Sequence, residues 1–267
     1  MAIFSLFLFS SQPSLFVTLM SILNFLSLTT NGYMELNGKH AKYAKFFDDP
    51  SKNSKSVENH QIQSRNGMLV FYTPSFIVGL VALSILPRHD LRFNMLAYVL
   101  TIHFFKRILE VLFVHKFSGF MMVDVAITIG VSYCVSTATM IYAQYLSQGL
   151  PSPVVDLRYV GIAMFLIGIS GNLYHHYILS SLRKEGDREY KIPKGGLFDL
   201  IICPHYFFEV VEFIGVSCIS QTMFSVCFTL GTIFLLLGRS RGTREWYVSK
   251  FGSSFRSDIK AIIPYLF

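Results

Sequence analysis

The chain has 267 residues, of which 52% are hydrophobic and only 15% are charged, and 26 of them are phenylalanine. Ordinary soluble domains are less apolar and more charged, so the composition indicates a polytopic membrane protein. The formal net charge of +7 would suggest nucleic acid as the partner of a soluble protein. Here the charges lie between apolar segments, and we expect a membrane partner and no nucleic acid.

Seven segments are long and apolar enough to cross a membrane, since roughly 20 apolar residues in a helix span about 30 Å of hydrocarbon. They lie near 13–30, 68–86, 94–115, 120–146, 157–180, 203–219 and 221–238. We therefore expect an all-α fold of about seven transmembrane helices around a cavity for a cofactor and a substrate. The run from Met1 has no basic leader, so the first segment is expected to be retained.

The distribution of cations predicts the orientation of these helices. With the N-terminus in the lumen, the cytosolic side holds 31–67, 116–119, 181–196 and the tail from Arg239, and these segments contain 18 of the 23 Lys and Arg residues. Cytosolic loops of membrane proteins are enriched in Lys and Arg. The C-terminus is then cytosolic, and residues 48–66 are expected to form a polar, mobile connector within the loop 31–67.

Several cofactor and metal motifs are missing from the sequence. The cysteines have no C-x-x-C spacing, so neither a disulfide framework nor a zinc site is predicted. There is no P-loop, and Gly168 and Gly171 do not complete the glycine pattern of a Rossmann fold. A nucleotide would have to be held in another way.

Ionisable side chains at membrane depth cost about 2.5–3.5 kcal/mol each on insertion scales, and they usually face a polar interior. In the third segment, His103, Arg107 and Glu110 follow one helical face at steps of four and three, and Lys106 can reach Glu110. These groups form either an ion-pair cluster that joins helices or part of a site. Four of them within eight residues favour a site.

The sixth segment begins with a second polar group. His205, Glu209 and Glu212 share one helical face, and Tyr206 lies one position around the helix. Di-metal sites in helical bundles use paired Glu-x-x-His motifs. The second such motif is missing, so we predict no metal and favour binding of an organic cofactor or acid chemistry.

The fifth segment carries a third group, which continues into the loop behind it. Asn172, His176 and Arg183 recur along one side of the helix, and the loop adds Lys184, Arg188, Tyr190, Lys191 and the turn Gly195–Gly196. Cations beside a flexible glycine turn suit a polyanionic cofactor whose phosphates lie at the interface. An ordinary cytosolic loop explains the charges but not Asn172 or His176.

These segments resemble a known family. "GNLYHHYILSSLRK", "YKIPKGGLFDLIICPHYFFEVVEFIG" and "WYVSKFGSSFRSDIKAIIPYLF" are similar to the C-terminal half of steroid 5α-reductases, especially the plant 5α-reductase-like group. "HFFKRILEVLFVHKFS" is closer to the related very-long-chain trans-2-enoyl-CoA reductases. The resemblance covers residues 95–267 and divides the chain there from an N-terminal membrane region, 1–94.

The resemblance implies an enzyme of the endoplasmic-reticulum membrane that uses NADPH to reduce a carbon–carbon double bond conjugated to a carbonyl. By motif position, the NADPH contacts carry over to Asn172, Arg183, Tyr190, Lys191, Glu209 and Tyr247. His176 stands where the steroid enzymes have aspartate, and His205 where both groups usually have asparagine. Both are expected to keep polar contacts with the cofactor. Thr243 replaces a histidine of the animal enzymes.

The proton donor is less clearly carried over. Steroid 5α-reductases use a glutamate and a tyrosine, and the matching positions here hold Tyr72 and Phe104. The lysine and tyrosine emphasised in enoyl-CoA reductases match Lys106 and Tyr206, which are both present. The catalytic candidates are therefore Tyr206, Lys106 and Tyr72.

Three functions remain open at this point. The resemblance favours reduction of a steroid 4-en-3-one to the 5α-3-oxosteroid, and the alternative is reduction of a very-long-chain trans-2-enoyl-CoA in fatty acid elongation. Either substrate is a hydrophobic lipid. A non-enzymatic lipid-binding or channel protein is the third reading, because buried charges also line ion paths. It requires a continuous polar stripe, whereas the polar groups here gather in the cytosolic halves of three segments.

Overall fold

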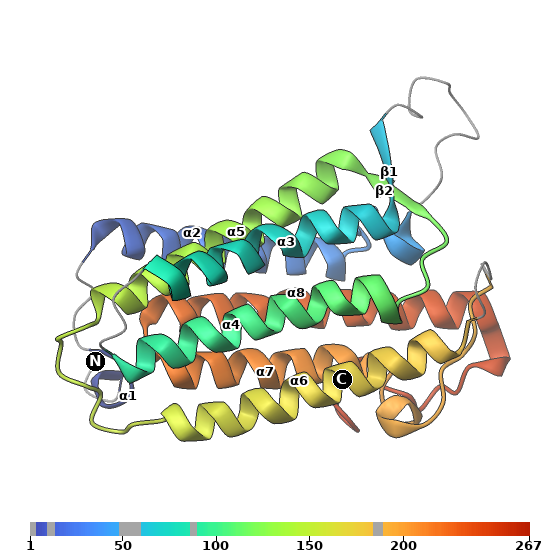
Figure 1. Ribbon diagram of the computed structural model, residues 1–267. Helices are drawn as coiled ribbons and strands as arrows, with labels where there is room; N and C mark the ends of the chain where they lie inside the picture. The colour runs from blue at the N-terminus through green and yellow to red at the C-terminus, as the bar shows by residue number, and fades with distance from the viewer. Residues whose placement is uncertain (1–3, 10–13, 48–59, 86–89, 184–188) are drawn as a thin grey trace.

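The computed structural model describes residues 4–9, 14–47, 60–85, 90–183 and 189–267, which form a bundle of seven long helices (Figure 1). The short helix α1 (Phe4–Phe7) precedes them. The long helices are α2 (Leu15–Leu36), α3 (Ser64–Ile85), α4 (Leu91–Leu109), α5 (Val123–Leu146), α6 (Arg158–Ser181), α7 (Pro204–Ser220) and α8 (Met223–Phe251). Each corresponds to one of the seven predicted segments.

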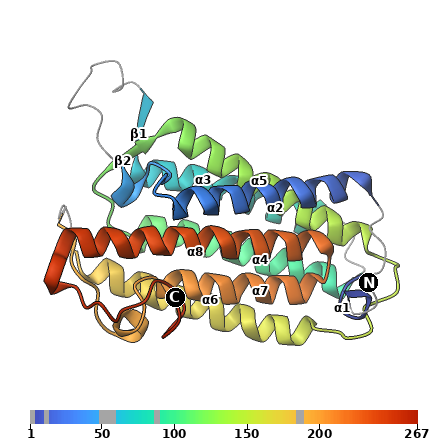
Figure 2. The same ribbon diagram turned by 180° about the vertical axis from the view of Figure 1, so that it is seen from behind.

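Five of these helices, α2, α3, α5, α6 and α8, are long and apolar enough to cross a membrane. The other two fall short of that standard, because α4 contains Arg92, Lys106 and Arg107 and α7 has only 17 residues. Both lie side by side with the longer helices in the two opposite views (Figures 1 and 2). The prediction of an all-α, polytopic membrane fold is confirmed.

Two predicted segments end too early. The first was expected to end near residue 30, and α2 runs to Leu36; the last was expected to end at residue 238, and α8 runs to Phe251. Arg239 therefore lies inside a helix, where it is only 4% exposed. Its Nη1 bonds Glu35 at 2.7 Å, at the end of α2. The positive charge of Arg239, which ends the apolar pattern in the sequence, is neutralised by Glu35 across the pair of helices α2 and α8.

Glycines bring the helices of two pairs close together. A Cβ on Gly161 would stand 2.6 Å from the carbonyl oxygen of Gly215, so α6 and α7 pack backbone to backbone. A Cβ on Gly32 would stand 2.6 Å from the carbonyl oxygen of Phe234, between α2 and α8. Small residues permit such close approach in membrane helices. These contacts fix which faces of α7 and α8 point into the bundle.

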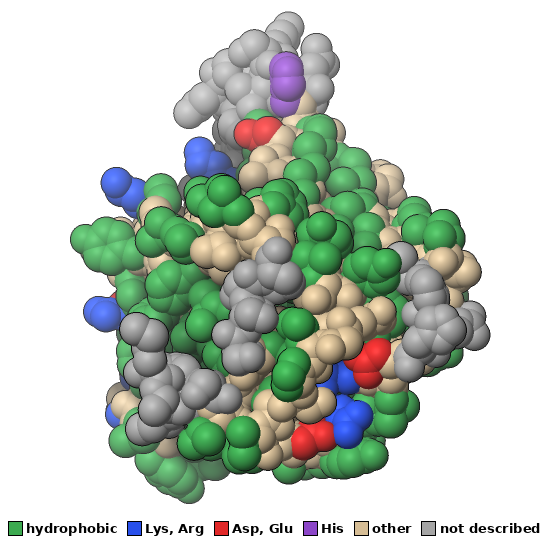
Figure 3. Space-filling view, turned by 90° about the vertical axis from the view of Figure 1, so that its left-hand side faces the viewer, with side chains coloured by type: hydrophobic (Ala, Val, Ile, Leu, Met, Phe, Trp, Pro, Cys, Tyr) green, Lys and Arg blue, Asp and Glu red, His purple; other side chains and the backbone are tan. Residues whose placement is uncertain are grey.

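One end of the bundle is closed by a buried polar network. Gln221, in the left-handed conformation (φ 51°), joins α7 to α8. Its side chain donates to the carbonyls of Phe7 and Val155 and accepts from Nη1 of Arg92 at 2.7 Å. Arg92 also bonds Asp156 at 2.8 Å. Seen from this side, the molecule is mostly hydrophobic with few charged groups (Figure 3).

Irregular segments surround the opposite end. A two-stranded antiparallel ribbon pairs β1 (Gln61–Gln63) with β2 (Phe120–Met122), and a π-helical turn, η4 (Glu110–Val114), ends α4. The remaining short turns are η1 (Ala44–Phe46), η5 (Gly196–Asp199) and η6 (Gly252–Ser254). Of the expected connector 48–66, residues 48–59 lie outside the described residues, and 61–66 form β1 and the start of α3 rather than a mobile loop.

The glycine turn predicted after α6 has the expected backbone. Gly195 and Gly196 have φ values of 88° and 54°, in the left-handed region that other residues seldom adopt. A Cβ on Gly196 would lie 2.8 Å from Nε2 of His175, and this nitrogen accepts a hydrogen bond from the backbone N–H of Leu197. His175 is therefore a structural residue that holds η5 against α6.

Candidate active site

A cavity of about 380 Å³ opens at the end of the bundle that carries the ribbon; we call it the outer cavity. Basic and aromatic side chains from distant parts of the sequence line it, namely Lys45, Lys116, Arg183, Tyr190, Lys191 and Tyr247. Arg183 lies 4.3 Å from the ring centroid of Tyr190, and Lys116 donates to the Arg183 carbonyl at 2.6 Å. The wall of the outer cavity suits a polyanionic ligand.

Lys45 is the cation of this cavity with the most unusual surroundings. Its Nζ lies 5.5 Å from the ring centroid of Phe46, 5.7 Å from that of Tyr247 and 6.0 Å from that of Trp246. It forms no ion pair with any residue that the structure describes. Burial lowers the pKa of Lys45 to about 8, and Arg239 and Arg183 add to that effect. A bound anion would supply the missing counter-charge.

Two polar atoms of the cavity wall, Nδ1 of His205 and Oγ1 of Thr243, are buried without a hydrogen-bond partner among the described residues. Buried polar atoms normally have partners, and leaving one unpaired costs about 1–3 kcal/mol. Here both atoms face the same cavity as the cations. A ligand with phosphate and ribose oxygens would pair with them, so the residues present fit a dinucleotide such as NADPH.

A second, smaller cavity of about 50 Å³ lies deeper between the helices; we call it the inner cavity. Its ionisable lining residues are Tyr72 from α3, His103 and Arg107 from α4, Tyr133 from α5 and Glu209 from α7. Hydroxyl side chains of α5 and α8 add Ser132, Ser136, Thr137 and Thr232. Leucine, methionine and phenylalanine side chains of α2, α4, α5, α7 and α8 complete the wall. Apolar walls with a few convergent polar groups are typical of a substrate site, but ligand pockets usually have roughly 300–1,000 Å³, so this cavity has to widen to admit a lipid.

The polar groups of the inner cavity are organised around Arg107. Its Nη2 donates to the Tyr72 hydroxyl at 2.6 Å, and its Nη1 pairs with Oε2 of Glu110 at 2.6 Å. The ring of Tyr133 stacks on that of Tyr72, with centroids 6.1 Å apart and 12° between the planes. Because the Tyr72 oxygen accepts from Arg107, its own proton is free to donate to a ligand in the cavity.

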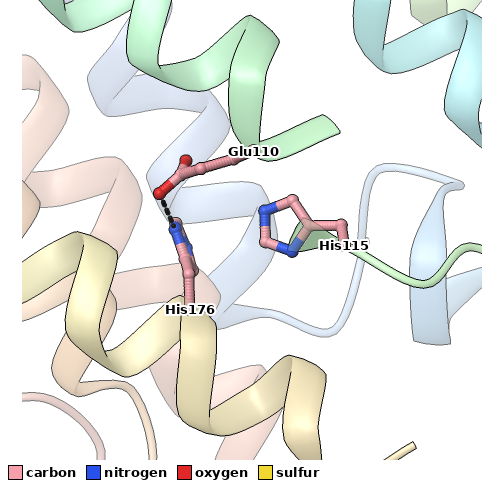
Figure 4. A group of neighbouring side chains, drawn as sticks. All are labelled: Glu110, His115 and His176. Atoms are coloured by element: carbon pink, nitrogen blue, oxygen red, sulfur yellow. Dashed lines mark hydrogen bonds and ion pairs between the residues drawn. The ribbon is translucent and has the colours of Figure 1, made fainter. Parts of the chain in front are cut away.

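Three histidines lead from the outer cavity toward the inner one: His115 and His205 line the outer cavity, and His176 is buried behind them. The ring of His176 is 5.3 Å from that of His205, which lines the outer cavity, and 4.8 Å from that of His115. Nδ1 of His176 lies 3.0 Å from Oε1 of Glu110, so this cluster continues to the ion pair of Arg107 (Figure 4). Burial and neighbouring cations hold the pKa of His115 at about 2, and His115 is neutral at physiological pH. Polar groups thus connect the outer cavity with the inner one.

Glu110, His115 and His176 have the ligand types of a metal site, with candidate atoms within 4.8 Å of one another (Figure 4). However, Glu110 already pairs with Arg107 at 2.6 Å and with Lys106 at 3.1 Å. Two cations on the only carboxylate of the group would repel a metal ion at this place. The charge distribution agrees with the prediction of no metal, which stays a prediction.

The predicted donors Lys106 and Tyr206 are not paired with each other. Lys106, which is 8% exposed, bonds Oδ1 of Asn172 and Glu110, and Asn172 donates to the His205 carbonyl at 2.8 Å. Tyr206 packs with Tyr247 and the hydrophobic residues around it, and it does not line the outer or the inner cavity. Tyr72, in contrast, faces the inner cavity.

The other predicted site residues divide between the two cavities. The outer cavity collects Arg183, Tyr190, Lys191, His205 and Tyr247, whereas Glu209 lies in the inner cavity. Asn172 and His176 are buried in the network between them. Lys184 and Arg188 lie outside the described residues.

Sequence reasoning missed Lys45, Lys116 and Tyr133 as site residues. The stretch "KYAKFF" at 42–47 mixes lysines with aromatic residues, which is a signal for a binding surface that could have been used. Lys116 is a single cation in a short loop, and Tyr133 is one aromatic residue in an apolar helix. Neither has a pattern around it.

The sequence is similar to several known proteins. The family model described as 3-oxo-5-alpha-steroid 4-dehydrogenase matches residues 121–267, more than half of the chain. Steroid 5-alpha-reductase DET2 of Gossypium hirsutum is 39% identical over 107 residues, which cover 40% of this chain and 42% of that protein. The 3-oxo-5-alpha-steroid 4-dehydrogenase 1 of Homo sapiens is 38% identical over 115 residues, covering 43% and 44%.

A very-long-chain enoyl-CoA reductase of Dictyostelium discoideum is also similar, with 31% identity over 173 residues, or 62% of this chain and 55% of that protein. The chain thus spans about half the length of the curated relatives it matches. The matched residues 121–267 include α6, α7 and α8, but not Lys45, Tyr72 or Arg107. The resemblance predicted from the motifs is confirmed.

Proposed function

The chain belongs to the 3-oxo-5-alpha-steroid 4-dehydrogenase family, and on that premise we propose that it reduces a carbon–carbon double bond conjugated to a carbonyl in a lipid, with NADPH as the reductant. The preferred substrate is a steroid 4-en-3-one, which becomes the 5α-3-oxosteroid. The observation that carries this proposal is the pair of cavities, one cationic and one apolar, joined by the cluster of His176 and Arg107.

The outer cavity is the proposed NADPH site. Lys45, Lys116, Arg183 and Lys191 would bind its phosphates, and Tyr190 and Tyr247 offer aromatic faces. His205 and Thr243 would use their unpaired atoms for its hydroxyl or phosphate oxygens. When bound, NADPH supplies the hydride for the reduction.

The inner cavity is the proposed place of the reaction. The Tyr72 hydroxyl donates to the carbonyl oxygen of the substrate, where negative charge develops as the double bond is reduced. Arg107 holds that hydroxyl at 2.6 Å and brings a positive charge close to the developing oxyanion. Tyr72 thus takes over at a position where the steroid enzymes have glutamate, although the second residue of their pair is Phe104 here.

The alternative substrate, a very-long-chain trans-2-enoyl-CoA, has its own support. The Dictyostelium enoyl-CoA reductase aligns over 62% of this chain, a larger share than either steroid enzyme named above. The lysine and tyrosine that the resemblance to enoyl-CoA reductases implies are present in this chain as Lys106 and Tyr206. Against it stands the geometry, because Lys106 is bonded to Asn172 and Glu110 and Tyr206 faces neither cavity.

The channel reading is less well supported. A channel needs polar groups along the whole bundle. In the described residues, a hydrophobic cluster that includes Leu96, Val216 and Phe224 lies between the inner cavity and the closed end at Gln221. The polar groups of the site therefore stop partway, as expected for a pocket that opens at one end.

We also propose that the protein resides in the endoplasmic-reticulum membrane with the N-terminus in the lumen. In this orientation the outer cavity and its cations face the cytosol, as the distribution of Lys and Arg predicts. NADPH would enter the pocket from that side.

The experiment that tests the function uses the purified protein in lipid nanodiscs. NADPH is added with either a 4-en-3-one steroid or a long-chain trans-2-enoyl-CoA, and products are identified by mass spectrometry. We expect a steroid product two mass units heavier than the substrate and loss of NADPH absorbance in equal amount. Turnover of the enoyl-CoA alone would establish the alternative. Failure of NADPH to raise the thermal unfolding midpoint would contradict both enzymatic readings.

A further inference from the structure

We propose that His103 is the acid that protonates the α-carbon of the substrate, with Glu212 as the residue that positions it. This inference rests on the proposed function, and it assigns a role to two buried side chains that the mechanism above does not use. Tyr72 and Arg107 account for the carbonyl oxygen. Reduction of a conjugated double bond also requires a proton on carbon, and a separate donor is needed for it.

His103 and Glu212 form a deeply buried acid–base pair at the wall of the inner cavity. Nδ1 of His103 lies 2.7 Å from Oε1 of Glu212, and the two residues are 5% and 0% exposed. Nε2 of His103 has no hydrogen-bond partner among the described residues, and the side chain lines the inner cavity. The free nitrogen is therefore available to a ligand in that cavity, on the same helix as Arg107 and one turn away from it.

The surroundings hold this pair in place. A Cβ on Gly168 would lie 2.5 Å from the backbone nitrogen of Glu212, so α6 packs directly against the backbone of α7 at this residue. The His103 ring packs against Phe104 and Phe213, with centroids 4.8 and 5.2 Å away. The ring has little freedom to turn.

The second oxygen of the carboxyl group, Oε2 of Glu212, is buried and has no hydrogen-bond partner in the part of the chain that the structure describes. A buried carboxylate with a single hydrogen bond is costly unless its partner is a cation. His103 is therefore the single side chain among the described residues to which this carboxyl group is hydrogen-bonded, and it fixes the orientation of the ring.

The step balances when His103 enters it with a proton on each ring nitrogen. Hydride addition at the β-carbon moves the π-electron pair of the double bond toward the carbonyl and leaves an enolate. The α-carbon of the enolate then takes the proton from Nε2 and forms a C–H bond. The electron pair of the broken N–H bond stays on Nε2, so His103 becomes a neutral imidazole. The proton on Nδ1 of His103 stays there, hydrogen-bonded to Glu212, throughout. A proton from water restores the imidazolium before the next turnover.

The test measures where and how stereospecifically deuterium enters the product. Wild-type protein in nanodiscs is run in D₂O with unlabelled NADPH and the substrate that it turns over, and the product ketone is reduced at once with borohydride to prevent exchange. NMR should show hydrogen at the β-carbon and one deuterium, in a single configuration, at the α-carbon. Absence of any reduced product from wild type would overturn the proposed function itself, and this inference with it.

The decisive variant is His103→Gln, which keeps a similar length but provides no acidic N–H. We expect turnover to fall about 100-fold, and the deuterium of the residual product to appear in both configurations because water replaces the donor. NADPH-induced thermal stabilisation should be retained. A residual product with a single configuration would overturn the proposal, because a purely structural loss slows turnover without changing the donor.

Glu212→Gln is the second variant and covers the case in which His103→Gln does not fold. It keeps a hydrogen-bond acceptor for Nδ1 but removes the charge. We expect a fall in kcat of at least tenfold with one deuterium configuration retained and with the KM for NADPH unchanged. An unchanged kcat would overturn the role of the pair.

Discussion

The Tyr72 hydroxyl accepts a hydrogen bond from Nη2 of Arg107 at 2.6 Å, and the guanidinium carbon of Arg107 lies 4.7 Å from the centroid of the Tyr72 ring. Two helices, α3 and α4, meet through this pair at the wall of the inner cavity. The phenol oxygen is occupied as an acceptor, so its proton points to another partner. A carbonyl oxygen in the cavity is the partner that the proposed reaction provides.

We predict that Tyr72→Phe lowers kcat by about 10²-fold, the scale found when one donor to a developing oxyanion is removed. The NADPH affinity should not change, because Tyr72 does not line the outer cavity. Turnover and NADPH titration by fluorescence measure the two quantities. The comparison variant is Tyr206→Phe, which removes the other candidate hydroxyl. A large loss in Tyr206→Phe with normal turnover in Tyr72→Phe would transfer the donor role to Tyr206.

Arg183 provides a test of the outer cavity that does not depend on turnover. Removing a charge-assisted contact to a phosphate costs about 1.5–3 kcal/mol, so Arg183→Ala should weaken NADPH binding about tenfold or more. The matched control is Arg241→Ala, because Arg241 is an exposed arginine on α8 that pairs with Glu245 outside the cavity. Equal NADPH affinities for wild type and Arg183→Ala, measured by calorimetry, would remove Arg183 from the cofactor site.

If NADPH binds in the outer cavity as proposed, Lys45 should make its affinity dependent on pH. With a pKa of about 8, Lys45 is charged at pH 7 and loses its proton as the pH rises through 8. The affinity should therefore fall between pH 7 and 9, and the fall should be smaller in Lys45→Met. Lys42→Met serves as the control, since Lys42 is an exposed lysine three residues away. The same pH dependence in wild type and Lys45→Met would contradict the assignment.

The folding stability of the ligand-free protein should instead rise with pH, opposite to the affinity for NADPH. The ordinary pKa of 10.5 applies to the unfolded chain, so between about pH 8 and 10.5 the unfolded state binds more protons than the folded state. Stability contributed by Lys45 then rises with pH in this window. Affinity and stability trends of opposite sign, both reduced in Lys45→Met, would separate a local effect of Lys45 from general alkaline unfolding.

The fold was largely predictable because it depends on regular patterns. Seven apolar runs predicted the seven long helices, and the steps of three and four in "HFFKRILE" placed Lys106 and Arg107 next to Glu110, as the structure has them. Such pairs are set by helix geometry alone. Helix ends were less predictable, since Arg239 is stabilised inside α8 by Glu35, more than 200 residues earlier in the chain.

The division of the site into two cavities could not be predicted, because it depends on how helices rotate against each other. One residue step turns a helix by about 100°, so neighbouring residues of α7 face different surroundings. The glycine contacts of α6 and α7, including Gly168, set this rotation and leave Glu209 in the inner cavity but Tyr206 outside it. Lys45 enters the site through a loop, whose path no periodicity describes.

The polar network at the closed end of the bundle should contribute to stability and not to the chemistry. Arg92 is 2% exposed and donates to the Ile219 carbonyl, the Gln221 side chain and Asp156. In Arg92→Met these acceptors lose their donor. Breaking a buried ion pair costs about 3–5 kcal/mol of folding stability, and we expect about 3 kcal/mol here because Asp156 is partly exposed. For a chain of this size that lowers the thermal midpoint by about 6–12 °C.

Arg241→Met, which breaks only an exposed pair, should leave the midpoint unchanged. NADPH affinity, measured well below the lowered midpoint, should equal that of wild type, and a weakened affinity would mean that the closed end is coupled to the outer cavity.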